Sequence, residues 1–138
     1  MNYEELINVR NEENNFAKEN GIYTTEISEG YAKAEIELVD KHRNYIGSVH
    51  GGCIFTLADT VAGAAASSHG DYMTTITGSI NYLSPALKTS KLIAEAREVK
   101  QGKKICVYDV EIMNDANEVL AKGSFSYFNL GKKLKKMM

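Results

Sequence analysis

The spacing of hydrophobic positions changes several times along the chain, and each change predicts an element. Residues 2–20 carry apolar side chains at helical intervals and end at a glycine, which predicts an amphipathic surface helix. Residues 22–28 and 31–39 alternate with a period of two around Glu29-Gly30. This alternation is typical of an antiparallel hairpin with one face in water.

The segment from Ser48 to Gly70 is apolar around nearly its whole circumference, which predicts a buried helix. Its many alanines and Gly63 allow other backbones to come close. Four strands are expected after this helix, separated by turn-forming residues. They cover residues 73–83, 91–100, 104–113 and 119–130. The expected order is therefore helix, two strands, buried helix and four strands.

One curved antiparallel sheet of six strands around one long central helix is the simplest way to bury these elements, and it belongs to the α+β class. The alternative is a split sheet with both helices packed on one flat face. It would leave the far side of the central helix in water, which its apolar sequence argues against. Because an open sheet has two unpaired edges, we expect pairing with a second copy, at least to a homodimer.

Composition places the chain among single globular domains. The 138 residues include 43% hydrophobic and 25% charged residues and one proline, which suits one domain over 1–138. The two cysteines, Cys53 and Cys106, lack the spacing of a metal site or a disulfide framework. We therefore expect no metal. The sequence shows no signal peptide and no long uncharged apolar run, so a cytoplasmic protein without a membrane segment is expected.

The net charge of −2 is unevenly distributed. Residues 1–40 hold ten acidic and three basic residues, whereas residues 41–138 hold eight acidic and thirteen basic ones. The later part can therefore attract an anionic ligand. Much of its positive charge lies in 131–138, which is expected to be a frayed basic tail. Since this tail lacks interleaved aromatic residues, no nucleic-acid binding is expected.

One carboxylate, Asp59, lies inside the predicted apolar helix and needs a partner or a function, because an isolated buried charge is costly. Gly51 and Gly52 at the helix start can present free backbone amides to a developing oxyanion, or can simply permit a tight turn. Eight residues separate Gly51 from Asp59, which is about 12 Å along the helix. If both act on one carbonyl, they must come from two subunits whose helices run antiparallel.

The combined pattern resembles the hotdog-fold acyl-CoA thioesterases of the PaaI type over roughly residues 22–130. The resemblance implies a hotdog fold and hydrolysis of an acyl-CoA thioester to free acid and coenzyme A. It implies composite sites in a homodimer, and we expect further assembly to a homotetramer. No cofactor is implied, because coenzyme A is part of the substrate. The residues that carry the resemblance are Asn44, Gly47, His50-Gly51-Gly52, Leu57-Ala58-Asp59, Tyr82-Leu83-Ser84-Pro85-Ala86 and Gln101-Gly102-Lys103.

The resemblance also implies catalytic roles. Asp59 would be the nucleophile or the general base that activates water, and the sequence leaves both open. Gly51 would polarise the thioester carbonyl, and Asn44 would orient the attacking water or the carbonyl. Thr75 would help to hold the water. A local turn for Asn44, a structural strand position for Thr75 and a structural pairing for Asp59 are the alternatives.

Five further residues are expected to contact substrate: His50, Gly52, Phe55, Tyr82 and Lys103. His50 has no Ser or Cys partner at motif spacing, so a bond that fixes the loop is its more natural role. Phe55 and Tyr82 are candidate walls of an acyl tunnel, with core packing as the alternative. Lys103 belongs to a basic turn that can attract coenzyme A phosphates, although solvated strand ends explain such lysines equally well.

Two other functions use the same ligand. A non-catalytic acyl-CoA-binding regulator would usually carry a DNA-binding segment, and residues 1–20 are too acidic and short for one. A hotdog hydratase or dehydratase needs a histidine and an acid poised on the acyl chain. No acid lies near His50 in its own loop. The sequence therefore favours the thioesterase.

Overall fold

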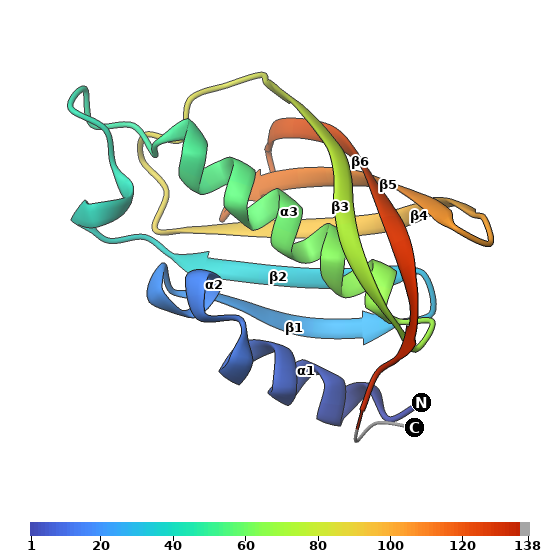
Figure 1. Ribbon diagram of the computed structural model, residues 1–138. Helices are drawn as coiled ribbons and strands as arrows, with labels where there is room; N and C mark the ends of the chain where they lie inside the picture. Colours follow the sequence, from blue (N-terminus) through green and yellow to red (C-terminus); the bar gives the residue numbers. More distant parts are fainter. Residues whose placement is uncertain (136–138) are drawn as a thin grey trace.

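The computed structural model describes residues 1–135 as one curved sheet with a long helix in its concavity (Figure 1). The strands lie in the order β1-β2-β4-β5-β6-β3, and every neighbouring pair is antiparallel. The predicted α+β class and the six strands are confirmed. The elements are α1 (Tyr3–Glu13), α2 (Asn15–Glu19), β1 (Ile22–Ser28), β2 (Tyr31–Glu37), the 3-10 helix η1 (Asp40–His42), α3 (Gly51–Ser67), β3 (Asp71–Tyr82), β4 (Lys91–Gln101), β5 (Ile105–Asn114) and β6 (Val119–Lys133).

The N-terminal segment forms two helices where the sequence predicted one. Asn14 separates them: its backbone N–H donates to the carbonyl oxygen of Arg10, and its side chain accepts from the N–H of Ala17 at 3.4 Å. An asparagine side chain competes with the helical backbone in this way, so it favours caps over helix interiors. The break turns α2 away from the axis of α1.

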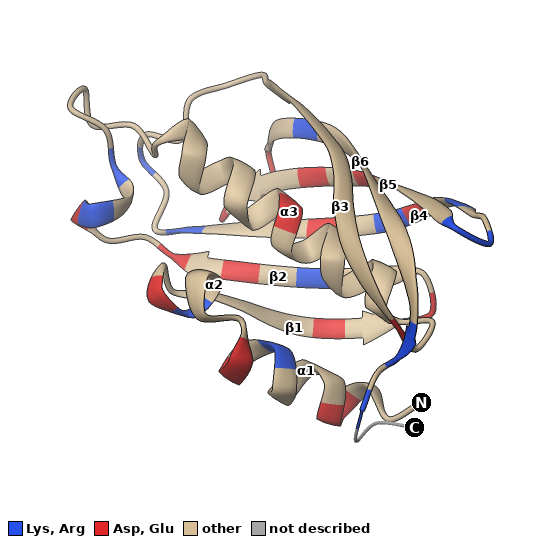
Figure 2. Ribbon diagram, viewed as in Figure 1, with Lys and Arg blue, Asp and Glu red and all other residues tan. Residues whose placement is uncertain are grey.

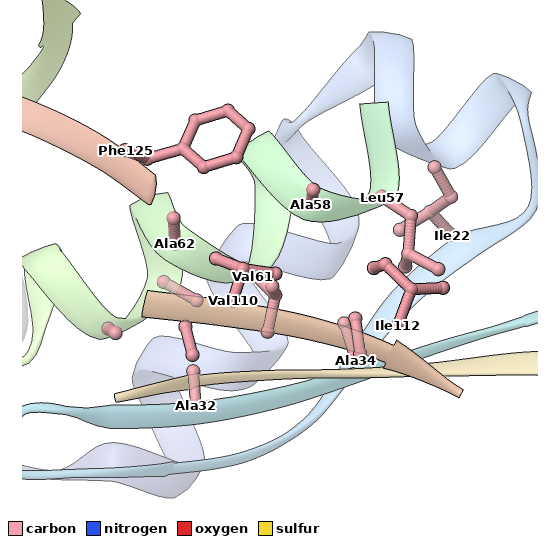
Figure 3. Packing of buried hydrophobic residues seen from close by; sticks show 14 of the residues in the cluster. Ile22, Ala32, Ala34, Leu57, Ala58, Val61, Ala62, Val110, Ile112 and Phe125 are labelled. Carbon is pink, nitrogen blue, oxygen red and sulfur yellow. The ribbon is translucent and has the colours of Figure 1, made fainter. Parts of the chain in front are cut away.

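The central helix α3 packs its buried side against β1, β2, β4 and β5 (Figure 1). Leu57, Ala58, Val61 and Ala62 are fully buried. In Figure 3, Leu57 and Val61 lie toward Ile112 and Val110 of β5, whereas Ala58 and Ala62 lie on the side of Phe125. The curved arrangement is therefore confirmed over the flat split sheet. The helix begins at Gly51, at the glycine pair where the sequence predicted its start, and residues 48–50 of the apolar segment belong to the loop before it.

One stripe of α3 is not buried, in contrast to the prediction of an all-round buried helix. Its members recur every three or four residues and lie on one face. They are half-buried or exposed: Gly52, Thr56, Asp59, Thr60 and Gly63. This stripe leaves part of the central helix available to a ligand or to another chain.

The two sheet edges differ. Helix α1 packs along β1, whereas β3 pairs only with β6 among the described residues. Side chains of β3 are largely exposed, including Tyr72 at 40% and Ile76 at 47%. The ladder with β6 shifts register between Thr75 and Thr77, which inserts one extra residue. A long exposed edge with apolar side chains is a natural surface for pairing with another chain.

The C-terminal segment is ordered further than expected. Strand β6 runs to Lys133, whose ammonium lies 3.2 Å from a carboxylate oxygen of Asp71. Leu134 is only 6% exposed, and its N–H donates to the carbonyl of Gly70. The predicted frayed tail from 131 therefore differs from the structure over its first four residues. Residues 136–138 of that tail lie outside the described residues.

Substitution of Gly78 by alanine is expected to destabilise the fold. An added Cβ would lie 2.6 Å from the ring of Phe125 and 3.0 Å from that of Phe55, which are packed together with centroids 5.3 Å apart. Overpacking of this kind costs roughly 1–3 kcal/mol. The urea midpoint should fall, whereas Ser79→Ala on the outer face should leave it unchanged. Equal midpoints for both variants would contradict the packing argument.

Candidate active site

Three elements converge on the carboxylate of Asp59, the one charged residue of α3 (Figure 2). From β3, the Thr75 hydroxyl donates to Asp59 Oδ1 at 2.9 Å. From β6, the Tyr127 hydroxyl lies 2.5 Å from the same Oδ1 and 2.6 Å from the backbone oxygen of Asp59. The second carboxylate oxygen, Oδ2, accepts no hydrogen bond from the described residues. One oxygen thus anchors the carboxylate, and the other remains available.

The tyrosine at this cluster keeps its proton. Burial raises the pKa of Tyr127 well above its ordinary value, and the negative charge of Asp59 raises it further. Because the phenol stays neutral, it donates to the carboxylate and stabilises its charged form. The interaction also satisfies a side chain that is almost fully buried.

A cation enters the same region from α1. The Arg10 guanidinium donates through Nη2 to the carbonyl of Thr60 at 3.3 Å, while its buried Nε has no partner among residues 1–135. Burial lowers the pKa of Arg10, and electrostatic interactions with Tyr127 and Asp59 act in the opposite direction. Even a lowered arginine pKa leaves the group protonated near neutral pH. Asp59 therefore faces a nearby positive charge.

A cavity of about 660 Å³ opens at this cluster. The stripe of α3 that carries Asp59 forms one side, β3 with Thr75 forms another, and α1 and α2 cover the far end. Phe55 lies on its wall with its ring against that of Phe125. The structure thus brings together three residues that the sequence analysis selected: Asp59, Thr75 and Phe55.

The start of α3 is a separate site. Its cap is His50, whose Nδ1 accepts from the N–H of Gly52 at 2.8 Å, and the N–H of Cys53 donates to the carbonyl of His50. The amide of Gly52 is therefore occupied, contrary to the expectation that both glycines present free donors. The N–H of Gly51 has no acceptor within the described part of the chain. It is the free donor at the positive end of the helix.

Tyr82 lies beside this helix start. Its hydroxyl donates to the carbonyl of Gly51 at 2.8 Å, and its ring forms part of a second hollow of about 260 Å³ with Leu83 and Pro85. Burial raises the pKa of Tyr82. The structure therefore places Gly51 and Tyr82 together, in a hollow distinct from the one that holds Asp59.

Four predicted residues line neither hollow. Two of them, His50 and Gly52, are hydrogen-bonded to each other at the start of α3. The other two are Asn44 and Lys103. Asn44 forms a local turn, since its Nδ2 donates to Ser48 Oγ at 2.8 Å and its Oδ1 accepts from the N–H of Ile46. Lys103 is exposed in the β4–β5 turn, where the carbonyl of Lys104 accepts from the N–H of Asn129. That turn is at the end of the sheet opposite to Gly51. In a single chain, neither residue reaches Asp59.

Sequence reasoning missed Tyr127 and Arg10. The inward position of Tyr127 follows from the alternation of β6, so the pattern indicated burial but not the bond to Asp59. Arg10 gave no signal, because a cation in a polar N-terminal helix normally faces water. Within residues 1–135, no group of three or more His, Cys, Asp or Glu side chains could hold a metal ion, and none of the helices there could span a membrane.

Comparison with known proteins identifies the family. The model of the thioesterase superfamily matches residues 46–121, more than half of the chain. A putative esterase of Archaeoglobus fulgidus is 44% identical over 72% of this chain and 66% of its own length. The acyl-coenzyme A thioesterase PaaI of Escherichia coli is 34% identical over 76% of this chain and 75% of its own. The chain therefore belongs to the thioesterase superfamily.

Solved structures support the same family assignment. The Escherichia coli PaaI protein superposes with a TM-score of 0.89 over 95% of each chain, at 29% identity. A Streptococcus mutans protein bound to acetyl-CoA superposes with a TM-score of 0.77 over 82% of this chain and 91% of its own, at 34% identity. These likenesses confirm the predicted hotdog fold of the PaaI type. The prediction of a thioester hydrolase is confirmed at the level of the family.

The capping role of His50 can be tested through stability. Replacement by alanine removes the acceptor for the Gly52 N–H and should lower the free energy of unfolding by about 1 kcal/mol. An asparagine at the same position supplies a side-chain oxygen and should restore most of the loss. Urea unfolding of the three proteins measures both effects. If alanine and wild type unfold at the same midpoint, His50 does not stabilise the helix start.

Proposed function

We propose that this protein hydrolyses an acyl-CoA thioester to the free acid and coenzyme A, with Asp59 as the residue that drives the reaction. The observation that carries the proposal is the anchored carboxylate: Thr75 and Tyr127 hold Oδ1, and Oδ2 has no partner among the described residues. Relatives named acyl-coenzyme A thioesterases support the reaction class. Neighbours bound to acetyl-CoA and to coenzyme A support the ligand.

Two chemical routes use the same carboxylate. In the first, Asp59 Oδ2 attacks the thioester carbonyl carbon, the coenzyme A thiolate leaves, and water hydrolyses the mixed anhydride. In the second, Oδ2 takes a proton from water as the resulting hydroxide attacks the carbonyl, and the thiolate leaves. The Tyr127 and Thr75 donors hold the carboxylate in a fixed position in either case. The N–H of Gly51 donates to the oxyanion that forms on the carbonyl oxygen.

The geometry of α3 supports a site built from two chains. Gly51 and Asp59 lie eight residues apart on one rigid helix, about 12 Å along its axis, and they line different hollows. We propose a homodimer in which each chain gives Gly51 to one site and Asp59 to the other. The exposed β3 edge and the unburied stripe of α3 support this pairing, because a two-fold axis beside them would set two α3 helices antiparallel.

Further assembly is part of the proposal. On the outer face of the sheet, a polar hollow of about 450 Å³ carries charges of both signs, including Arg97, Glu95, Lys122 and Glu111. A face that mixes both signs can complement a copy of itself, which supports a homotetramer of two dimers. A cytoplasmic location agrees with the two free cysteines.

Nothing in the site favours the hydratase. That reaction needs a histidine free to exchange a proton with the acyl chain, whereas His50 Nδ1 already accepts from Gly52. The exposed ring of His50 also forms no hydrogen bond to any carboxylate in residues 1–135. The carboxylate at the cavity therefore gives the better account of the chemistry.

Replacement of Asp59 by asparagine is expected to lower kcat by roughly 10²–10⁴-fold, because the amide keeps the shape but is neither a base nor a nucleophile. Thiol release from an acyl-CoA panel measures the rate. Asp115→Asn is the matched control, since this carboxylate in the β5–β6 turn accepts from Ser90 and lines neither hollow, and it should keep kcat near wild type. Near wild-type turnover by the Asp59 variant would refute its role.

Water labelled with oxygen-18 distinguishes the two routes. In a single turnover with excess enzyme, a mixed anhydride that water attacks at the Asp59 carboxyl carbon transfers an unlabelled carboxylate oxygen into the acid product and leaves label in the protein. That outcome assigns Asp59 as the nucleophile. Label in the product alone, with no acylated protein detected by mass spectrometry during the turnover, contradicts the covalent route and assigns Asp59 as the base.

The shared site predicts complementation between two inactive variants. Gly51→Pro deletes the N–H while a proline is well tolerated at the first helical position, after a His50 backbone that is already extended (ψ 134°). It should lower kcat by roughly 10²–10³-fold, whereas Gly51→Ala retains the donor. Mixed dimers with Asp59→Asn then contain one site with both defects and one intact site.

Equal amounts of the two variants, unfolded and refolded together, should recover about one quarter of wild-type activity, because half of the dimers are mixed and each has one good site. The same variants refolded separately and then assayed together without exchange are the control. Absence of recovery in exchanged dimers would show that Gly51 and Asp59 serve the same chain's site or do not both act.

A further inference from the structure

The cavity beside Asp59 has mostly apolar walls at its far end. Helices α1 and α2 contribute Leu6, Val9, Phe16 and Ala17 to that end. Arg10 also lines it, and α1 carries this side chain to the cavity as its one basic residue (Figure 2). A cation in such a place is not explained by hydrolysis of the thioester.

Most of the donors of Arg10 are unused. A guanidinium offers five N–H groups, and here Nη2 makes one long bond to the carbonyl of Thr60 at 3.3 Å. Nε is buried without a partner, and Nη1 makes no hydrogen bond to residues 1–135. No carboxylate of the described chain lies within ion-pair distance of it. Arg10 is half-buried and Nη1 is not among the buried unpaired atoms, so Nη1 is the donor that an acceptor on a ligand can reach, through a charge-assisted hydrogen bond.

Along the axis of α3, Arg10 lies past Asp59, on the side away from the start of the helix. A Cβ built on Gly63 would lie 3.2 Å from Arg10 Nη2 and 3.2 Å from the Tyr127 hydroxyl, so the missing side chain leaves room for both groups. Asp59 and Gly63 are one helical turn apart, roughly 6 Å. An acyl chain whose carbonyl is at Asp59 therefore needs only a few carbon atoms to bring its far end to Arg10.

Other charged groups line the cavity besides Arg10. Asp59 on α3, Glu13 on α1, Asp71 on β3 and Lys135 after β6 also line the space. Asp71 is paired with Lys133, and Glu13 is exposed. Arg10 is therefore the cation that combines apolar surroundings with unused donors.

We propose that this cavity holds the acyl group of the substrate and that Arg10 selects acyl groups with an oxygen acceptor several atoms from the thioester. The proposal rests on the thioesterase function above and narrows its substrate class. Apolar walls bury the methylene chain, and the guanidinium binds a hydroxyl, carbonyl or carboxylate oxygen. A plain alkyl end would leave the same donors unpaired, which is how a polar site rejects an analogue that lacks the oxygen.

Three substrates of equal chain length test the selection: hexanoyl-CoA, 6-hydroxyhexanoyl-CoA and adipoyl-CoA. We expect wild-type kcat/KM to be at least about tenfold higher for one or both oxygenated substrates, mainly through KM. A preference for adipoyl-CoA marks an anionic end, and one for the hydroxyl marks a neutral acceptor. If hexanoyl-CoA is hydrolysed as well as both others, the selection is refuted while hydrolysis stands. If wild type releases thiol from no acyl-CoA, the proposed function itself fails.

Variants connect the preference to Arg10. Arg10→Met should remove it by weakening turnover of the oxygenated substrates, with hexanoyl-CoA unchanged or improved. Arg10→Lys retains a charge without the planar fork and should keep part of the preference. Lys18→Met on α2 removes an exposed cation paired with Glu12 and should leave all ratios unchanged. An equal loss on all three substrates in Arg10→Met and Arg10→Lys would mean that Arg10 only holds α1 in place.

Discussion

The close approach of α3 to the sheet is the constraint on which the rest of the structure depends. Small side chains meet across this contact: Ala58, Ala62 and Ala65 on the helix are fully buried, as are Ala32 and Ala94 on the sheet. Since neither surface projects far, the two backbones lie close, and the sheet must curve to stay in contact along the helix (Figure 3). A larger residue on either side would separate the layers.

This contact also explains why Asp59, the carboxylate of the proposed reaction, lies on a helix. Most of the surface of α3 is packed, which makes the helix a rigid support. The remaining stripe carries Asp59. Strands β3 and β6 close over that stripe and supply Thr75 and Tyr127. Precise placement of a carboxylate is easier on such an element than on a loop. Gly51, the first residue of α3, presents a backbone N–H whose position the helix itself determines.

Much of the fold could be predicted from the sequence, because periodicity and turn residues are local signals. The separation of Asp59 from Gly51 followed from helix geometry, whereas Thr75 was selected through the family resemblance. Tyr127 and Arg10 could not be assigned, since they lie 68 and 49 residues from Asp59 and reach it only through strand register and helix docking. Asn44 shows the reverse case, in which a motif position forms a local turn within the single chain.

The register shift in β3 has a consequence for the spacing of the site. Thr75 pairs with Tyr127 and Gly78 pairs with Phe125. Three steps along β3 therefore match two steps along β6. Regular alternation would direct one of these two positions to the outer face. The extra residue therefore lets the hydroxyl at Asp59 and the gap beside the Phe55–Phe125 pair face the same way. In this strand the number of residues is as strictly constrained as their identity. An insertion or deletion there would turn either Thr75 away from Asp59 or Gly78 away from the Phe55–Phe125 pair.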